Sequence, residues 1–275
     1  MLELPEVLTI SQQLKEHIVG KKITKVLPPS KAHKFCWYNG EPAEYDAAIK
    51  GCEVKSVEGF GIFVEITFSN GYKLCINDGV NVRLMPSSEK SKNFQLLMEL
   101  EDDLVLVFTV AMYGGIFLHD GSYDNEYYLK SKQAILPFSK AFIEYYHKIF
   151  KESKSNLSAK AFLATQQRFP GIGNGVVQDI LFEAGIHPKR KISSFSETDK
   201  DRLLENIISV LNEMTQKGGR DTEKNIFGEK GGYKVSMSKN TMGHSCLKCG
   251  GEIVKETYLG GSIYYCTQCQ PFIKA

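Results

Sequence analysis

The 275-residue sequence has no uninterrupted apolar run long enough to cross a lipid bilayer. Its first fifteen residues carry Glu3, Glu6 and Lys15 where a secretory leader would have a basic start and an apolar core. From these two features we expect neither a membrane-spanning helix nor a secretory signal peptide. They predict a cytoplasmic protein with no membrane partner. Internal repeats are also lacking, which excludes repeat architectures such as solenoids.

A strong net charge is lacking as well, because the formal charge at pH 7 is only +2. The charge is nevertheless uneven. Residues 1–150 carry 16 Lys and Arg against 19 Asp and Glu, whereas residues 151–275 carry 18 against 13. A basic C-terminal half suits contact with a polyanion. A solvated basic surface explains the same numbers equally well, so charge alone leaves both interpretations open.

The cysteines number seven and fall into two kinds. Cys36, Cys52 and Cys75 are scattered among apolar residues and are predicted to belong to the core. The other four form two C-x-x-C pairs with sixteen residues between them: Cys246, Cys249, Cys266 and Cys269. Two such loops complete a tetrahedral thiolate site for zinc, whereas stable disulfides are disfavoured in a cytosolic chain. Because four thiolates leave no open position, one structural zinc ion is predicted.

Turn signals and hydrophobic periodicity divide the chain into three predicted domains of an α+β protein. Residues 1–135 begin with a helix whose apolar face recurs at positions 7, 10, 14 and 18, and short alternating strands follow. This pattern predicts a β-sandwich with a leading helix. Residues 136–243 have helical spacing and end in a loop rich in Gly, Lys, Ser and Asn. Residues 244–275 carry the cysteine pairs and are predicted to form a zinc-finger hairpin.

A glycine-rich turn precedes one predicted helix in the stretch FPGIGNGVVQDILFEAG. Gly171 and Gly173 permit a tight turn with exposed backbone amides. Asn174 follows at the start of the helix, where a phosphate is favoured. A simple packing joint between two helices explains the same pattern. The zinc hairpin that follows in the sequence favours contacts with DNA.

Three motifs, in this order, resemble the formamidopyrimidine-DNA glycosylase/endonuclease VIII family: ELPEV, GIGNGVVQDILFEAGIHP and CLKCG…YYCTQCQ. The resemblance covers essentially the whole chain. It implies a β-sandwich domain and a helix–two-turn–helix domain with a zinc finger, which bind double-stranded DNA that is damaged or abasic. It also implies removal of oxidised bases from flipped-out nucleotides. We expect a monomer that associates with bacterial nucleoid DNA.

The resemblance assigns catalytic roles to the start of the chain. In this family an N-terminal proline attacks the sugar C1′, and the resulting Schiff base permits strand cleavage. Leu2 stands at that position here, so we expect the amine chemistry to be altered or missing. The resemblance makes Glu3 the proton shuttle, and Glu6 also matches the family start. Carboxylates near a helix N-terminus have purely structural roles as well.

The resemblance also implies contacts with DNA. Gly173 and Asn174 correspond to a phosphate contact. Tyr113 is next to residues 111–112, where the resemblance implies the side chain that fills the gap left by the flipped base, and its aromatic ring is predicted to wedge into the base stack. A core strand residue is the alternative for Tyr113. Two cations of the family are absent, because Ile62 and Ser262 stand where a lysine and an arginine are implied. Their loss should weaken DNA binding and flatten its salt dependence.

Three functions are compatible with these residues. The first is a base-excision-repair DNA glycosylase with altered or missing AP-lyase chemistry. The second is a catalytically inactive binder of damaged or abasic DNA, and the third is a zinc-stabilised module that binds RNA or protein. Retention of Glu3 favours the first, and loss of the proline, lysine and arginine favours the second. We prefer the glycosylase because it is the family's prevailing activity.

Overall fold

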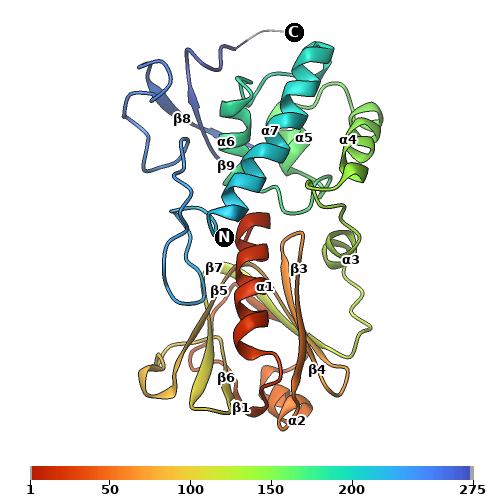
Figure 1. The fold of residues 1–275 in the computed structure, drawn as a ribbon, viewed down its shortest axis with the longest axis vertical. Coiled ribbons are helices and arrows are strands. Elements are labelled where there is room, and N and C mark those ends of the chain that lie inside the picture. Colours follow the sequence, from red (N-terminus) through yellow and green to blue (C-terminus); the bar gives the residue numbers. More distant parts are fainter. Residues whose placement is uncertain (1, 273–275) are drawn as a thin grey trace. The chain divides into compact units, whose positions relative to one another are not determined.

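The structure is a computed structural model that describes residues 2–272, and it divides into two compact units. The first unit comprises Met1–Lys132 and Gly218–Gly232, and the second comprises Gln133–Lys217 and Tyr233–Ala275. Figure 1 shows the course of the chain. The segment 218–232 thus packs with the N-terminal unit, although the sequence places it in the predicted domain 136–243. The division into three domains stays a prediction. Among the described residues, no helix is both long and apolar enough to cross a membrane.

The first unit is built on a seven-stranded sheet. The strand order is β1-β6-β7-β5-β4-β3, and β2 pairs with β7. The strands are β1 (Ile23–Leu27), β2 (Cys36–Tyr38), β3 (Val54–Phe60), β4 (Phe63–Phe68), β5 (Lys73–Pro86), β6 (Leu96–Leu100) and β7 (Leu104–His119). Three helices accompany them: α1 (Leu4–Ile18), α2 (Tyr45–Ile49) and α3 (Glu126–Lys132).

The long strands β5 and β7 join two halves of this sheet. They pair with each other along almost their whole length. One half adds β4 and β3 beside the first part of β5, and the other adds β6 and β1 beside the first part of β7. A register shift between Asp78 and Val80 separates the halves, as a β-bulge does where a strand bends. The predicted N-terminal β-sandwich with a leading helix is therefore confirmed, with two halves that are continuous through β5 and β7.

Helix α1 covers the sheet with the predicted apolar face. Val7, Ile10, Leu14 and Ile18 are each at most 3% exposed and lie in the main core. Their spacing places them on one side of the helix. The helix lies close to β3 at Gly59, where a Cβ atom would lie 2.5 Å from the Ser11 hydroxyl oxygen of α1. The sequence periodicity therefore predicted both the helix and its buried side.

The second unit is helical and ends in a two-stranded hairpin. Its elements are α4 (Lys140–Glu152), α5 (Ala159–Ala164), α6 (Val176–Glu183), α7 (Glu197–Gln216), β8 (Ile253–Tyr258) and β9 (Gly261–Cys266). Ser158 caps α5, and Ser196 forms a capping box with Asp199 at the start of α7. Helix α5 ends at Ala164, shortly before Gln166 and Gln167, which both adopt positive φ angles. The predicted helical domain with a finger hairpin is confirmed.

A buried polar cluster lies outside the main core of the first unit. Glu65 accepts hydrogen bonds from the Tyr128 hydroxyl at 2.6 Å and from Lys132 Nζ at 2.8 Å. The Cys75 thiol lies 3.3 Å from Glu65 and 3.4 Å from His119 Nε2. Glu65, Cys75 and His119 are close enough to one another to hold a metal ion. Each of them already has a hydrogen-bond partner, however, so the cluster is explained as a satisfied polar network.

The same network predicts a pH dependence of stability. Burial tends to raise the pKa of Glu65, but hydrogen bonds from Lys132 and Tyr128 outweigh it and lower the pKa to about 2. An unfolded glutamate titrates near pH ~4.3. The folded pKa is the lower one, so the stabilisation is present above pH ~4.3 and disappears as the pH falls towards 2.

We therefore expect Glu65→Gln to reduce the free energy of unfolding most at neutral pH, with a difference from wild type that shrinks below pH ~4.3. Chemical unfolding at a series of pH values measures this. Glu126→Gln is the control, because Glu126 forms an exposed pair with Lys130. A difference for Glu65→Gln that stays constant from neutral pH to pH ~2 would contradict the assignment.

Candidate active site and nucleic-acid interface

Leu2 lies in the core of the first unit. Its side chain is 4% exposed and belongs to the main apolar cluster. Its backbone N–H donates to the carbonyl oxygen of Asp78 at 2.6 Å. With Met1 in place this nitrogen belongs to a peptide bond, and resonance removes the basic lone pair that a nucleophile needs. The geometry gives Leu2 a packing role, and a catalytic role for it stays a prediction.

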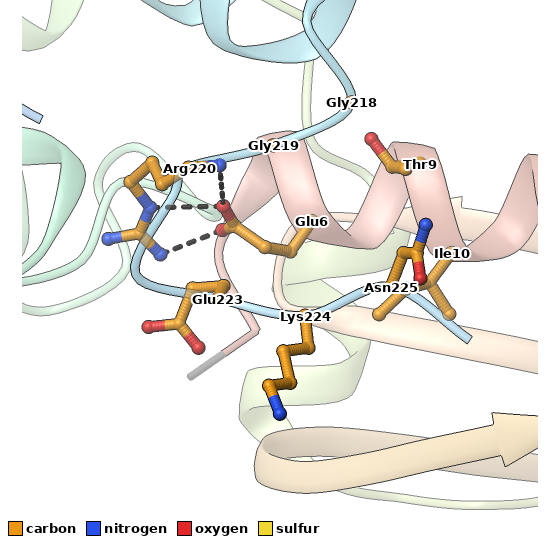
Figure 2. A pocket seen from close by; sticks show the side chains of 9 residues that line it. All are labelled: Glu6, Thr9, Ile10, Gly218, Gly219, Arg220, Glu223, Lys224 and Asn225. Atoms are coloured by element: carbon orange, nitrogen blue, oxygen red, sulfur yellow. Dashed lines mark hydrogen bonds and ion pairs between the residues drawn. The ribbon is translucent and has the colours of Figure 1, made fainter. Parts of the chain in front are cut away.

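Glu3 and Glu6, at the start of α1, share a buried arginine. Arg220 Nη1 lies 3.2 Å from Glu3 Oε2. Arg220 also donates to Glu6 through Nε at 3.0 Å, Nη2 at 2.7 Å and its backbone N–H at 3.1 Å, and Figure 2 shows these three contacts. All three residues are at most 4% exposed. Because these charges are buried away from water, each one is stabilised by its charged partners.

The charges of this cluster reinforce one another. Burial by itself would lower the pKa of Arg220, but the carboxylates of Glu3 and Glu6 outweigh burial and raise it. The guanidinium therefore stays a cation. Glu6 meets the fork of Arg220 in the bidentate geometry that gives the strongest arginine–carboxylate pairs. Glu6 thus anchors the arginine, and the arginine in turn orients Glu3.

The segment 218–232 holds Arg220 in place. Gly219 has a φ of +95°, and a Cβ atom there would lie 3.3 Å from Glu6 Oε1, so a glycine suits this approach. Farther along, the Ile226 side chain is fully buried in the core, and its carbonyl accepts from the backbone N–H of Leu84 at 2.9 Å. A cavity of about 10 Å³ remains between α1 and this segment, room for about one water molecule (Figure 2).

Sequence reasoning missed Arg220. The arginine lies 214 positions after Glu6, and no local pattern pairs the two. The available signal was weak: an arginine that directly follows Gly218 and Gly219 in a segment otherwise typical of a polar loop. The two glutamates, by contrast, were found from the motif at the start of the chain.

Tyr113 lies on β7 beside this site. Burial, followed by the charges of Asp78 and Glu3, raises the pKa of its hydroxyl, so Tyr113 and Glu3 share an electrostatic environment. Tyr113 is 36% exposed and its neighbour Met112 is 71% exposed. The partly exposed ring agrees with the expected wedge, which stays a prediction. Ile62, where the resemblance implies a lysine, is buried and 9% exposed.

The glycine turn of the second unit leads directly into α6. The Gly173 carbonyl accepts from the Val177 N–H at 3.2 Å. The side-chain oxygen of Asn174 is buried and has no hydrogen-bond partner within the described residues. A Cβ atom at Gly261, in the β8–β9 hairpin, would lie 3.2 Å from that oxygen. The structure thus brings Asn174 to the hairpin, and its contact with phosphate stays a prediction.

The four C-terminal cysteines converge. Their sulfur atoms all lie within 4.8 Å of one another. The sulfur–sulfur distances of 3.4 Å for Cys249–Cys266 and 3.8 Å for Cys246–Cys269 exceed a disulfide bond. The Gly251 N–H donates to the Cys249 sulfur at 3.3 Å, as backbone amides do to thiolates. The donor set fits a tetrahedral metal ion.

Comparisons with known proteins agree with these two units. The profile of the formamidopyrimidine-DNA glycosylase N-terminal domain matches residues 1–147, and that of the glycosylase H2TH domain matches residues 135–225. The chain therefore belongs to the formamidopyrimidine-DNA glycosylase family.

Individual relatives are similar over their whole length. A formamidopyrimidine-DNA glycosylase from Exiguobacterium sp. is 28% identical, over 98% of this chain and 99% of that protein. One from Carboxydothermus hydrogenoformans is 29% identical, over 98% and 100%. The structure of Lactococcus lactis Fpg with DNA containing an abasic site has a TM-score of 0.81 at 23% identity, over 98% of this chain and 100% of that one. The MutM (Fpg) protein of Thermus thermophilus has a TM-score of 0.79 at 23% identity, over 98% of each chain.

The buried arginine predicts a large effect on stability. Arg220→Ala should lower the free energy of unfolding of the first unit by about 3–5 kcal/mol, because both carboxylates lose a buried partner. Urea unfolding followed by the fluorescence of Trp37, the only tryptophan, measures this unit. The control is Lys55→Ala in the same unit, whose exposed pair with Glu53 should contribute less than about 1 kcal/mol. Equal effects of the two substitutions would refute the role of Arg220.

Proposed function

We propose that this protein is a base-excision-repair DNA glycosylase that acts on damaged double-stranded DNA and has weak or absent AP-lyase activity. Family membership supports the substrate class, because the relatives are formamidopyrimidine-DNA glycosylases. The observation that carries the altered chemistry is the pairing of a buried, hydrogen-bonded Leu2 with a Glu3 carboxylate oriented by Arg220. In this proposal the start of the chain keeps the acid, Glu3, and lacks the nucleophilic proline, because Leu2 stands in its place.

In this proposal Glu3 supplies the chemistry of base release. The Glu3 carboxylate can accept a proton from a water molecule. The water oxygen then bonds to the sugar C1′, and the base leaves with the electrons of the bond that joined it to C1′. Arg220 holds Glu3 in its charged form, as a base requires. Glu6 keeps Arg220 in place and has a structural role. Without an amine at C1′, no Schiff base forms to promote strand cleavage.

DNA binding is divided between the two units. We propose that Tyr113 contacts the base stack from the first unit and that Gly173 and Asn174 contact a phosphate from the second. The place of Asn174 next to the hairpin at Gly261, directly before α6, supports this contact, with its side-chain amide as the donor to phosphate. The protein is proposed to act as a monomer. Loss of the cations at Ile62 and Ser262 should leave a shallow salt dependence.

The four cysteines are proposed to hold one structural zinc ion. Zinc–sulfur bonds of about 2.3 Å in a tetrahedron suit four converging thiolates. When bound, the ion would crosslink the two ends of the β8–β9 hairpin. Since it leaves no ligand position open, it has no part in the reaction.

We expect one zinc ion per chain by elemental analysis of the purified protein. Removal by a chelator should unfold the hairpin and weaken DNA binding, because zinc binding supplies folding free energy to small cysteine sites. Cys249→Ser should lose the metal, whereas Cys52→Ser, outside the cluster, should keep it. Protein that is fully folded and contains no metal would refute the site.

Replacement of the proposed base tests the mechanism. Glu3→Gln should reduce base release at least about 100-fold, since it removes the proton acceptor. Affinity for the same duplex should change little. The control is Glu16→Gln, on the exposed side of the same helix. An active Glu3→Gln variant would remove Glu3 from the mechanism.

The function itself is tested by a panel of duplexes that each carry one oxidised base, together with borohydride trapping on a duplex that carries one abasic site. We expect base release without a trapped adduct. A trapped adduct at Met1, Leu2 or a lysine, located by mass spectrometry, would show that an amine has replaced the proline. Binding without release of any base would identify an inactive damage binder.

A further inference from the structure

Two aromatic side chains project from the first unit at β2. Phe35 is 47% exposed and Trp37 is 51% exposed, whereas Cys36 between them is buried. Strand β2 runs parallel to the end of β7, and the Phe35 carbonyl accepts from the Gly114 N–H at 3.0 Å. Phe35 directly precedes β2 and Trp37 lies within it, so two exposed rings flank a buried residue along this segment.

Strand β2 lies next to the part of β7 that follows Tyr113. Trp37 is paired with Gly115, which has no side chain of its own beside the indole ring. A Cβ atom at Gly115 would lie 2.1 Å from the ring of Phe117, so that ring would have to move to accommodate one. Tyr113 directly precedes Gly114, whose N–H donates to the Phe35 carbonyl. The two exposed rings therefore come from a segment that adjoins the residue proposed as the wedge.

The charge of the surrounding segment has one sign. Residues 28–40 contain Lys31, His33 and Lys34 and no Asp or Glu. Lys31 and Lys34 are both exposed, and Lys34 Nζ lies 5.3 Å from the centre of the Phe35 ring. Exposed aromatic rings beside cations are the combination that binds single-stranded nucleic acid, with bases stacked on the rings and phosphates next to the lysines.

We infer that Phe35 and Trp37, with Lys31 and Lys34, form a stacking surface that binds unpaired bases of single-stranded DNA. The inference rests on the proposed function, since it extends the DNA contact of Tyr113 along β7 and β2. The charges favour a polyanion as occupant, because an apolar protein surface would offer no partner for the two lysines. Unpaired bases are required, because in a duplex the faces of the bases are already stacked.

Trp37 is the only tryptophan of the chain, so its fluorescence reports this surface directly. Titration with a 12-nucleotide oligo(dT) should quench the emission and reach saturation. The affinity should fall as salt rises, and Lys34→Ala should reduce the slope of log affinity against log salt by about 0.7. Unchanged emission at oligo(dT) concentrations that saturate binding would overturn the inference.

Variants test the two rings. Trp37→Ala and Phe35→Ala should each weaken binding of a labelled oligo(dT), measured by anisotropy, about tenfold, the order of magnitude expected for a lost stacked base. Trp37→Phe should restore much of the affinity. Tyr127→Ala is the matched control, because Tyr127 is a 52% exposed aromatic residue on α3 of the same unit. Thermal unfolding of each variant checks that its fold is intact.

Two outcomes would overturn the stacking surface. One is an equal affinity of Trp37→Ala and wild type for oligo(dT). The other is a Trp37 emission that depends on protein concentration without DNA, which would identify a contact between two copies of the chain.

Base release from damaged duplex is measured in parallel. No base release together with intact quenching would reject the proposed function and support the stacking surface. Base release without quenching would support the proposed function and reject the stacking surface.

Discussion

The buried ion cluster of Glu3, Arg220 and Glu6 is the interaction on which the candidate site depends. Helix α1 and the residue before it contribute the two acids, and the segment 218–232, more than 200 residues later, contributes the arginine. Charges this deeply buried persist only when each is paired and hydrogen-bonded. The cluster therefore fixes the start of α1 and the segment 218–232 against each other within the first unit. The orientation of Glu3 follows from this constraint.

This constraint also explains how a family member can differ at its first residues and keep an ordered site. Leu2 occupies the core, where its apolar side chain is stabilised by burial, and its amide is satisfied by Asp78. In the proposed mechanism, a packing residue thus stands where the resemblance implies the nucleophile of the family. The acid that follows is retained and held as a carboxylate. In that mechanism, base release takes place without the amine attack that the resemblance implies for other members, because position 2 is a leucine.

Much of the fold was predictable from local patterns. The spacing of positions 7, 10, 14 and 18 predicted the buried side of α1. Four cysteines at zinc-ligand spacing predicted the convergence of their sulfur atoms. The packing of 218–232 with the N-terminal unit was not predictable, because it depends on Ile226 entering a core formed by residues far away in the sequence. The buried pairing of Glu65 with Lys132 was missed for the same reason.

The sequence by itself determined the helices, the strand alternation, the cysteine pairs and the family motifs, since these depend on residues close together along the chain. Tertiary structure alone decided that Arg220 pairs with Glu3 and Glu6, that Leu2 is buried, and that Phe35 and Trp37 are exposed. The physical reason is that ion pairs, burial and strand register arise between segments distant in sequence. Their free energies exist only once the chain has folded.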